Sequence, residues 1–114
     1  MESIELAHAI VDLVEELQAE DIVMLDLRSV SILADYFVIC SSGSERQSRA
    51  MQEAVDEGLE RLGKRPYGVE GSADAGWILM DYGDVVLHIF SPEKRAYYRL
   101  EELWHQAPVV VKMQ

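Results

Sequence analysis

The residues with the greatest potential for chemistry include a short serine-rich loop. Ser41-Ser42-Gly43-Ser44 follows an apolar segment and precedes a helical pattern, a setting in which backbone N–H groups can bind an anion. The loop lacks the lysine of a P-loop and the three glycines of a dinucleotide-binding fingerprint. Ser44 with Gln47 three residues later also matches a capping box. We therefore interpret the loop as a helix cap first and as an anion cradle second.

Three carboxylates and one histidine could also suggest chemistry. Asp35, Asp81 and Asp84 are potential metal ligands, but no His-rich or Cys-rich set accompanies them. Asp81 and Asp84 flank Tyr82-Gly83, where aspartates are common turn residues. His88 has no nucleophile nearby in sequence, which favours a structural or partner-facing role over a general base. The sequence predicts no metal site, no cofactor and no enzyme activity.

Residues 76–90 predict a β-hairpin whose two faces differ. A two-residue loop at Tyr82-Gly83 would place Asp81 opposite Asp84 and Trp77 opposite His88. One face is wholly apolar and predicts a core: Ile78, Met80, Val85, Leu87 and Ile89. The other face mixes polar and apolar residues: Trp77, Leu79, Asp81, Val86, His88 and Phe90. This mixture indicates either a half-exposed contact surface or a face covered by a second layer of the chain.

Other segments supply the elements that must position these residues. Apolar spacing predicts a helix over residues 4–19 with Ser3 as N-cap, and a helix from Glu45 to Leu62 ended by Gly63. Ser91-Pro92 predicts the start of a helical segment that runs to about Trp104. Strands are expected at 21–27, at 36–41 in a central position, and at 66–70 on an edge. The fold class is α/β (α+β), a mixed sheet of about five strands packed against helices.

Length and charge narrow the classes of protein. The 114 residues, 49% hydrophobic, predict one domain over 1–106 and a C-terminal tail over 107–114 without assigned structure. The net charge is −11, and residues 1–27 hold eight carboxylates without any Lys or Arg. Such a charge disfavours nucleic-acid binding and suits a basic protein partner, although it could serve solubility alone.

Two further features bear on the compartment. No apolar run is long enough for a membrane span, and the acidic start is unlike a signal peptide. The single cysteine, Cys40, lies in an apolar run and predicts a buried thiol in a reducing cytoplasm.

Several segments resemble the ribosomal silencing factor (RsfS, or Iojap) family over about residues 5–105. In chain order they are Asp35–Cys40, Ser42–Ser44, Val69–Gly71, Gly76–Phe90 and Arg95–Trp104. The resemblance implies a fold similar to nucleotidyltransferases without their activity. Gly43-Ser44 matches the Gly-Ser opening of that superfamily, but the alternating acidic pair that holds metal is absent. Asp56 and Glu57 are adjacent and fall on a predicted helix.

The resemblance also implies a function. Family members bind a basic protein of the large ribosomal subunit, the one numbered fourteen, at the intersubunit face. They thereby block association with the small subunit and repress translation under nutrient limitation. The implied contact residues are Trp77, His88, Tyr98 and Leu100, with Asp81 as a polar contributor. Two alternatives stay open, a nucleotidyltransferase-like enzyme using Gly43, Ser44 and a carboxylate, and a homodimer paired through the Trp77 face.

Overall fold

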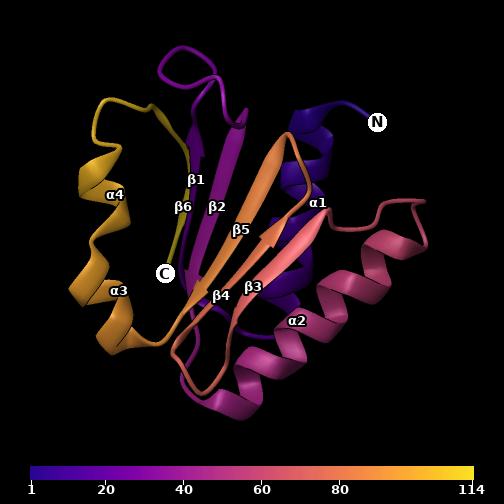
Figure 1. Cartoon of the computed structure of the whole chain (residues 1–114), viewed down its shortest axis with the longest axis vertical. Helices are drawn as coiled ribbons and strands as arrows, with labels where there is room; N and C mark the ends of the chain where they lie inside the picture. The colour runs from indigo at the N-terminus through magenta and orange to yellow at the C-terminus, as the bar shows by residue number, and fades with distance from the viewer.

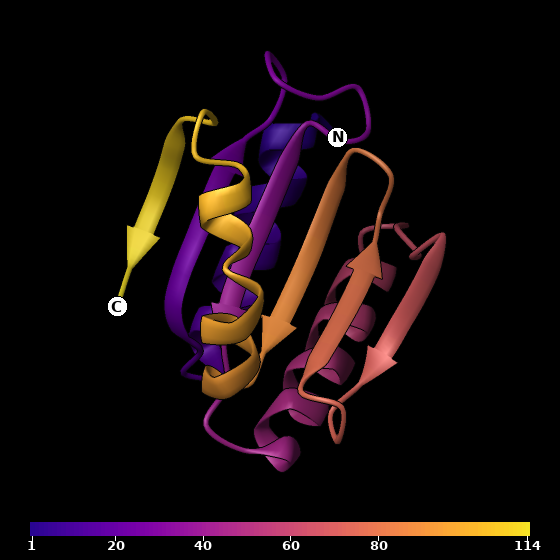
Figure 2. The same ribbon diagram turned by 60° about the vertical axis from the view of Figure 1, so that its left-hand side comes forward.

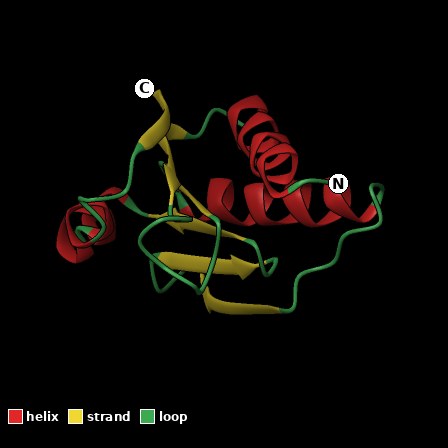
Figure 3. Ribbon diagram, turned by 90° about the horizontal axis from the view of Figure 1, so that it is seen from above, coloured by secondary structure: helices red, strands yellow, loops and turns green.

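A mixed sheet lies between two helical layers in the computed structural model, which describes residues 1–114 (Figure 1). The elements in chain order are α1 (Ser3–Glu16), β1 (Glu20–Asp26), β2 (Tyr36–Ser41), α2 (Glu45–Glu60), β3 (Gly68–Ser72), β4 (Trp77–Asp81), β5 (Val85–Phe90), α3 (Pro92–Tyr98), α4 (Leu100–Leu103) and β6 (Val109–Met113). The long helices α1 and α2 cover one face, and the short helices α3 and α4 lie on the other, as the view from above shows (Figure 3).

The sheet has the strand order β3-β4-β5-β2-β1-β6. β2 pairs with β5 in parallel, and the other neighbouring pairs are antiparallel. β2 is central and almost wholly buried, which confirms its predicted position. The fold class is also confirmed, but the sheet has six strands because residues 109–113 add β6 to the edge of β1.

The core divides into two clusters, one on each face of the sheet. The larger lies beneath α1 and α2 and contains the whole predicted apolar face of the hairpin: Ile78, Met80, Val85, Leu87 and Ile89. These side chains are at most 1% exposed, so the core prediction is confirmed. The smaller cluster lies beneath α3 and α4 and contains Val23, Leu25, Leu27, Ala34, Ile39, Phe90 and Ala107.

The hairpin register differs from the sequence prediction. The two-residue loop is Gly83-Asp84, because Tyr82 remains paired through a hydrogen bond from its N–H to the Val85 carbonyl at 2.9 Å. Tyr82 is buried, which favours a strand position for this bulky side chain over the loop position. Consequently Trp77 lies opposite Phe90, and His88 lies opposite Leu79. The register moves by two residues, an even number, so the residues of each face stay together.

The two long helices show how local chemistry sets their ends. The N-cap of α1 is Glu2 and not Ser3, since the Glu2 N–H donates to Glu5 Oε1 at 2.9 Å. α1 ends at Glu16, earlier than predicted, and Gln18 has a φ of 63°. The predicted cap of α2 is confirmed, because Ser44 Oγ accepts from the Gln47 N–H at 3.0 Å.

The end of α2 and the C-terminal helical segment also differ in part from expectation. α2 ends at Glu60, and Leu62 is 52% exposed and does not join the buried stripe. The segment that opens at Ser91-Pro92 is divided at Arg99, whose φ of 48° separates α3 from α4. No Gly or Pro marks this break in the sequence. The two short helices therefore form an arm of residues 92–103 that lies over one face of the sheet (Figure 2).

Candidate partner-binding surface

Aromatic side chains gather on the sheet face beneath α3 and α4. They come from β2, β4, β5, α3 and the end of α4, and we call them the aromatic cluster: Phe37, Trp77, His88, Phe90, Tyr98 and Trp104. The Trp77 ring centroid lies 4.5 Å from that of Tyr98 and 4.8 Å from that of Phe90. Aromatic pairs at such spacings add stability beyond their buried area. The cluster thus joins the C-terminal arm to the sheet.

The buried side chain of His88 is hydrogen-bonded to Trp77. Trp77 Nε1 donates a hydrogen bond to His88 Nδ1 at 3.1 Å, so the His88 proton resides on Nε2. His88 is 3% exposed, and burial lowers its pKa to about 4, which keeps the ring neutral at pH 7. Nε2 has no hydrogen-bond partner. His88 therefore orients Trp77 from the interior and does not form part of the outer surface.

A groove opens where the arm stops covering the sheet. It has a volume of about 290 Å³ and is lined by Glu70, Gly71, Ala75, Trp77, Leu79 and Tyr98. Tyr98 is 45% exposed, and Trp77 and Leu79 are half-buried. The outer part of the mixed hairpin face is thus a half-exposed surface, whereas the chain itself covers Phe90 and His88. The half-exposed character expected of a contact surface is found in the outer part of this face, and a covering layer of the chain is found over the inner part.

The remaining candidate contact residues, Leu100 and Asp81, lie outside the lining of the groove. Leu100 is partly buried and packs against the smaller core cluster. Asp81 lies on the groove side of β4, at its far end, where Oδ1 accepts from the Gly83 N–H at 2.7 Å. Asp81 therefore stabilises the hairpin turn as well as adding negative charge to this face.

Arg95 is a positioning residue to which sequence reasoning gave no role. Its guanidinium donates to Ser41 Oγ at 2.9 Å and to the Asp21 carbonyl at 2.7 Å. It also forms a salt bridge of 3.0 Å with Glu101, beyond the break at Arg99. The Arg95 side chain is only 12% exposed. It ties both short helices to β1 and β2, and its signal in the sequence was only its place in the family-like segment 95–104.

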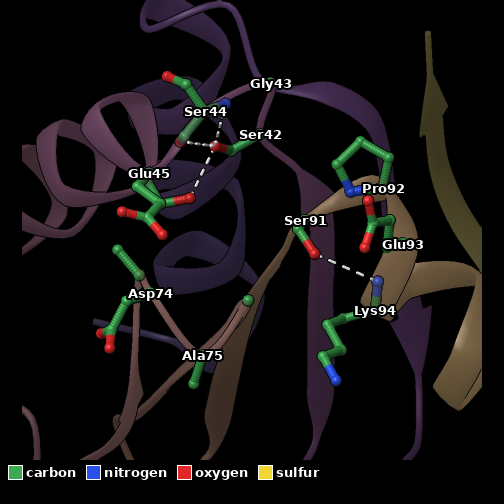
Figure 4. A pocket seen from close by; sticks show the side chains of 13 residues that line it. Ser42, Gly43, Ser44, Glu45, Asp74, Ala75, Ser91, Pro92, Glu93 and Lys94 are labelled. Carbon is green, nitrogen blue, oxygen red and sulfur yellow. Dashed lines mark hydrogen bonds between the residues drawn. The ribbon is translucent and has the colours of Figure 1, made fainter.

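The Gly43-Ser44 loop lines a second cavity (Figure 4). It has a volume of about 470 Å³, and the starts of α2 and α3 border it. Gly43 N–H donates to Gln47 Oε1 at 2.6 Å, and Ser42 Oγ bonds to Ser48 Oγ at 2.7 Å. Ser44 Oγ accepts from the Gln47 N–H, so the loop caps α2, in agreement with the first interpretation.

Four charged residues line this cavity. Glu45, Asp74 and Glu93 line it beside Lys94, and no group of three His, Cys, Asp or Glu side chains with metal-binding geometry occurs in the chain. Asp56 and Glu57 lie on α2, so the alternating acidic pair on a strand is absent.

Cys40 is buried, and burial raises the pKa of its thiol to about 12. None of the helices has the length and apolarity required to cross a bilayer.

The fold and this surface define a small α+β domain with an acidic exterior and a half-exposed aromatic groove. The family model described as "Ribosomal silencing factor during starvation" matches residues 1–114. The chain belongs to the ribosomal silencing factor (RsfS) family, which confirms the resemblance in the sequence.

Individual relatives agree with this assignment. The chain is 39% identical to ribosomal silencing factor RsfS of Halalkalibacterium halodurans over 110 residues, 96% of this chain and 94% of the relative. It is 40% identical to RsfS of Bacillus subtilis over 95 residues, 83% and 80% of the two chains. A crystal structure of a Chromobacterium violaceum protein superposes with a TM-score of 0.88 at 32% identity, covering 92% of this chain and 88% of that one.

Proposed function

We propose that this chain acts in the cytoplasm by binding the large ribosomal subunit and blocking its association with the small subunit. The contact would be made with the basic protein numbered fourteen at the intersubunit face, and translation would fall under nutrient limitation. Family membership supports the ribosomal setting, since the relatives are named ribosomal silencing factors and the family description refers to starvation.

The groove beside Trp77 and Tyr98 is the observation that carries the choice of surface. Trp and Tyr are enriched among the residues that dominate binding energy at protein interfaces. Here both rings are packed against each other and only partly exposed, so little conformational freedom is lost when a partner covers them. Leu100 and Asp81 would extend the contact, and His88 would act through its hydrogen bond to Trp77.

Charge supports a basic partner. The net charge of −11 attracts basic proteins, and Glu70 places a carboxylate in the groove itself. Complementary charge speeds encounter and suppresses incorrect pairing.

A binding protein of this kind needs no catalysis, because occupancy of the intersubunit face is sufficient. The helix cap formed by Ser44 and the hydrogen bond between Ser42 and Ser48 account for the Gly43-Ser44 loop without a substrate. The rival enzyme hypothesis requires metal-dependent nucleotide binding, which isothermal calorimetry measures directly.

The test is co-sedimentation of the purified chain with isolated large and small subunits, followed by light scattering of subunit joining. We expect the chain to migrate with large subunits only, and to lower joining when it is added before the small subunits. A Tyr98→Ala variant should lose both effects, whereas Leu62→Ala, similarly exposed but on the α2 side, should keep them. Failure of the unmodified chain to co-sediment with large subunits would contradict the proposal. So would a normal rate of subunit joining when the large subunits are saturated with the chain.

A further inference from the structure

The outer edge of β3 is unpaired. β3 is the last strand of the sheet, beside β4 (Figure 2). Residues 68–71 are exposed. An edge strand presents N–H and C=O groups that can pair with another extended chain. Strand addition of this kind is a recurrent mode of peptide recognition, in which neighbouring pockets select the side chains.

The groove lies directly beside this edge. Glu70 is paired with Leu79, so its side chain shares the sheet face of Leu79 and Trp77. Alternate side chains of a strand project to the same face. A segment added to β3 would therefore direct alternate side chains toward the groove.

The groove chemistry fits a long cationic side chain. The Trp77 and Tyr98 rings provide aromatic faces for the aliphatic stem and for a cation–π contact. Glu70 forms no ion pair within the chain, so its carboxylate is free to receive the charged end. An Arg or Lys thus satisfies both the apolar and the acidic part of the groove.

The opposite edge of the sheet is less suited to a basic segment. Pro108 precedes β6, and the pairing of β1 with β6 contains an irregularity between Met24 and Leu25. Both cavities beside this edge are lined by Lys112. Bulges and lysines discourage pairing at an edge, and the positive charge would repel a basic strand.

We propose that the basic partner adds an extended segment to the outer edge of β3 and inserts an Arg or Lys into the groove lined by Glu70, Trp77 and Tyr98. Its backbone would pair with residues 68–70. This inference rests on the proposed function, and it specifies the binding mode and the recognised side chain.

Proline substitutions test the backbone contact. Neighbouring strand residues direct their N–H groups to opposite edges, so one of Gly68 and Val69 directs its N–H away from β4. Gly68→Pro and Val69→Pro are compared with Gly68→Ala and Val69→Ala, which keep the N–H; a Cβ at Gly68 meets no atom within 4 Å. The outward position is identified as the one where Pro leaves the melting temperature unchanged. At that position we expect Pro to weaken binding to large subunits roughly tenfold, because it removes about one net hydrogen bond to the partner.

Two further measurements keep the inference falsifiable if both prolines destabilise β3. Glu70→Lys should weaken binding by about tenfold or more, because a like charge repels the inserted cation. Glu70→Gln, which only removes the negative charge, should weaken binding less. The amides of residues 68–70 should become protected from hydrogen exchange in the complex. Normal binding by Glu70→Lys, or unprotected amides in a formed complex, would overturn the inference while the proposed function stands. Absence of binding by the unmodified chain would overturn both.

Discussion

Trp77 Nε1 and His88 Nδ1 are joined by a 3.1 Å hydrogen bond between neighbouring strands, although the two residues are not directly opposite. Trp77 on β4 is paired with Phe90 on β5, and its indole ring reaches diagonally to His88, which is paired with Leu79. The bond fixes the tautomer of a buried histidine and the orientation of a half-exposed tryptophan. One contact therefore couples the interior of the sheet to its candidate binding surface.

The burial of His88 predicts an acid-sensitive fold. His88 has a folded pKa of about 4 and an ordinary value of 6.5, so the unfolded chain binds the proton first as pH falls. The contribution of His88 is fully present above about pH 6.5 and is lost progressively toward pH 4, by up to about 3 kcal/mol. Urea unfolding at a series of pH values measures it. In His88→Asn, which keeps an acceptor near the Nδ1 position, the loss over this interval should be smaller; equal slopes for both chains would contradict the assignment.

The sequence predicted the two faces of this hairpin but not its register. Alternation assigns Ile78 and Leu87 to the core whichever loop is used. The loop position depends on the burial of Tyr82, a tertiary property that local turn preference does not contain. The diagonal bond between Trp77 and His88 was likewise beyond pattern analysis, because it depends on rotamers set by the packed cluster.

The C-terminal region shows the same limit. Val109–Met113 is a short run whose strand form depends on pairing with β1, far away in sequence. The break at Arg99 contains no Gly or Pro. Arg95 bonds to Glu101 on the other side of this break, and to Ser41 and Asp21 in the sheet. Local propensity carries no information about such partners.

Removing the Arg95 anchor should loosen the C-terminal arm. Arg95→Ala removes the donors to Ser41 and Asp21 and leaves Glu101 without its partner, at a cost of roughly 1–3 kcal/mol. Limited proteolysis within residues 91–108 should accelerate. Arg99→Ala, whose ion pair with Glu102 is exposed, should change neither observable by a comparable amount. Unchanged proteolysis in Arg95→Ala would show that the aromatic cluster alone holds the arm.

The aspartates of the hairpin should behave as turn residues. Asp81→Asn keeps an oxygen acceptor for the Gly83 N–H, so the double variant with Asp84→Asn should fold and bind large subunits measurably. Neither chain should gain thermal stability from Mg²⁺ or Mn²⁺. A large metal-induced rise in melting temperature, lost in the double variant, would instead favour the enzyme hypothesis.

The acidic first helix should act on association at long range. Asp12, Glu15 and Glu16 are exposed on α1, on the sheet face opposite the groove, whereas Glu5 also caps the helix and is left unchanged. Reversing these three residues to Lys should slow association with large subunits and flatten its salt dependence, with little effect on dissociation. Stopped-flow measurements at several ionic strengths provide the test. If the salt dependence is unchanged, this charge serves solubility alone.

Substitution of Tyr98 should affect mainly binding, whereas substitution of Trp77 should affect both binding and folding stability. Tyr98→Ala truncates a 45% exposed residue whose ring packs against Trp77, so the melting temperature should fall less than in Leu87→Ala. Affinity for large subunits should fall roughly 30-fold to 1000-fold, the range of an interface hot spot. Trp77→Phe keeps a ring on the surface but leaves His88 Nδ1 without a donor, which should cost about 1–3 kcal/mol of folding stability as well.

Leu87→Ala supplies the control for a purely internal position. Leu87 is 0% exposed on the opposite face, and its truncation should cost about 2–5 kcal/mol of stability. Any binding defect of this variant should vanish below its unfolding temperature, because Leu87 cannot touch a partner. If Tyr98→Ala destabilises the fold as much as Leu87→Ala, the exposed ring is a structural element of the arm. If Tyr98→Ala instead binds normally, the partner uses a surface other than the Trp77–Tyr98 groove.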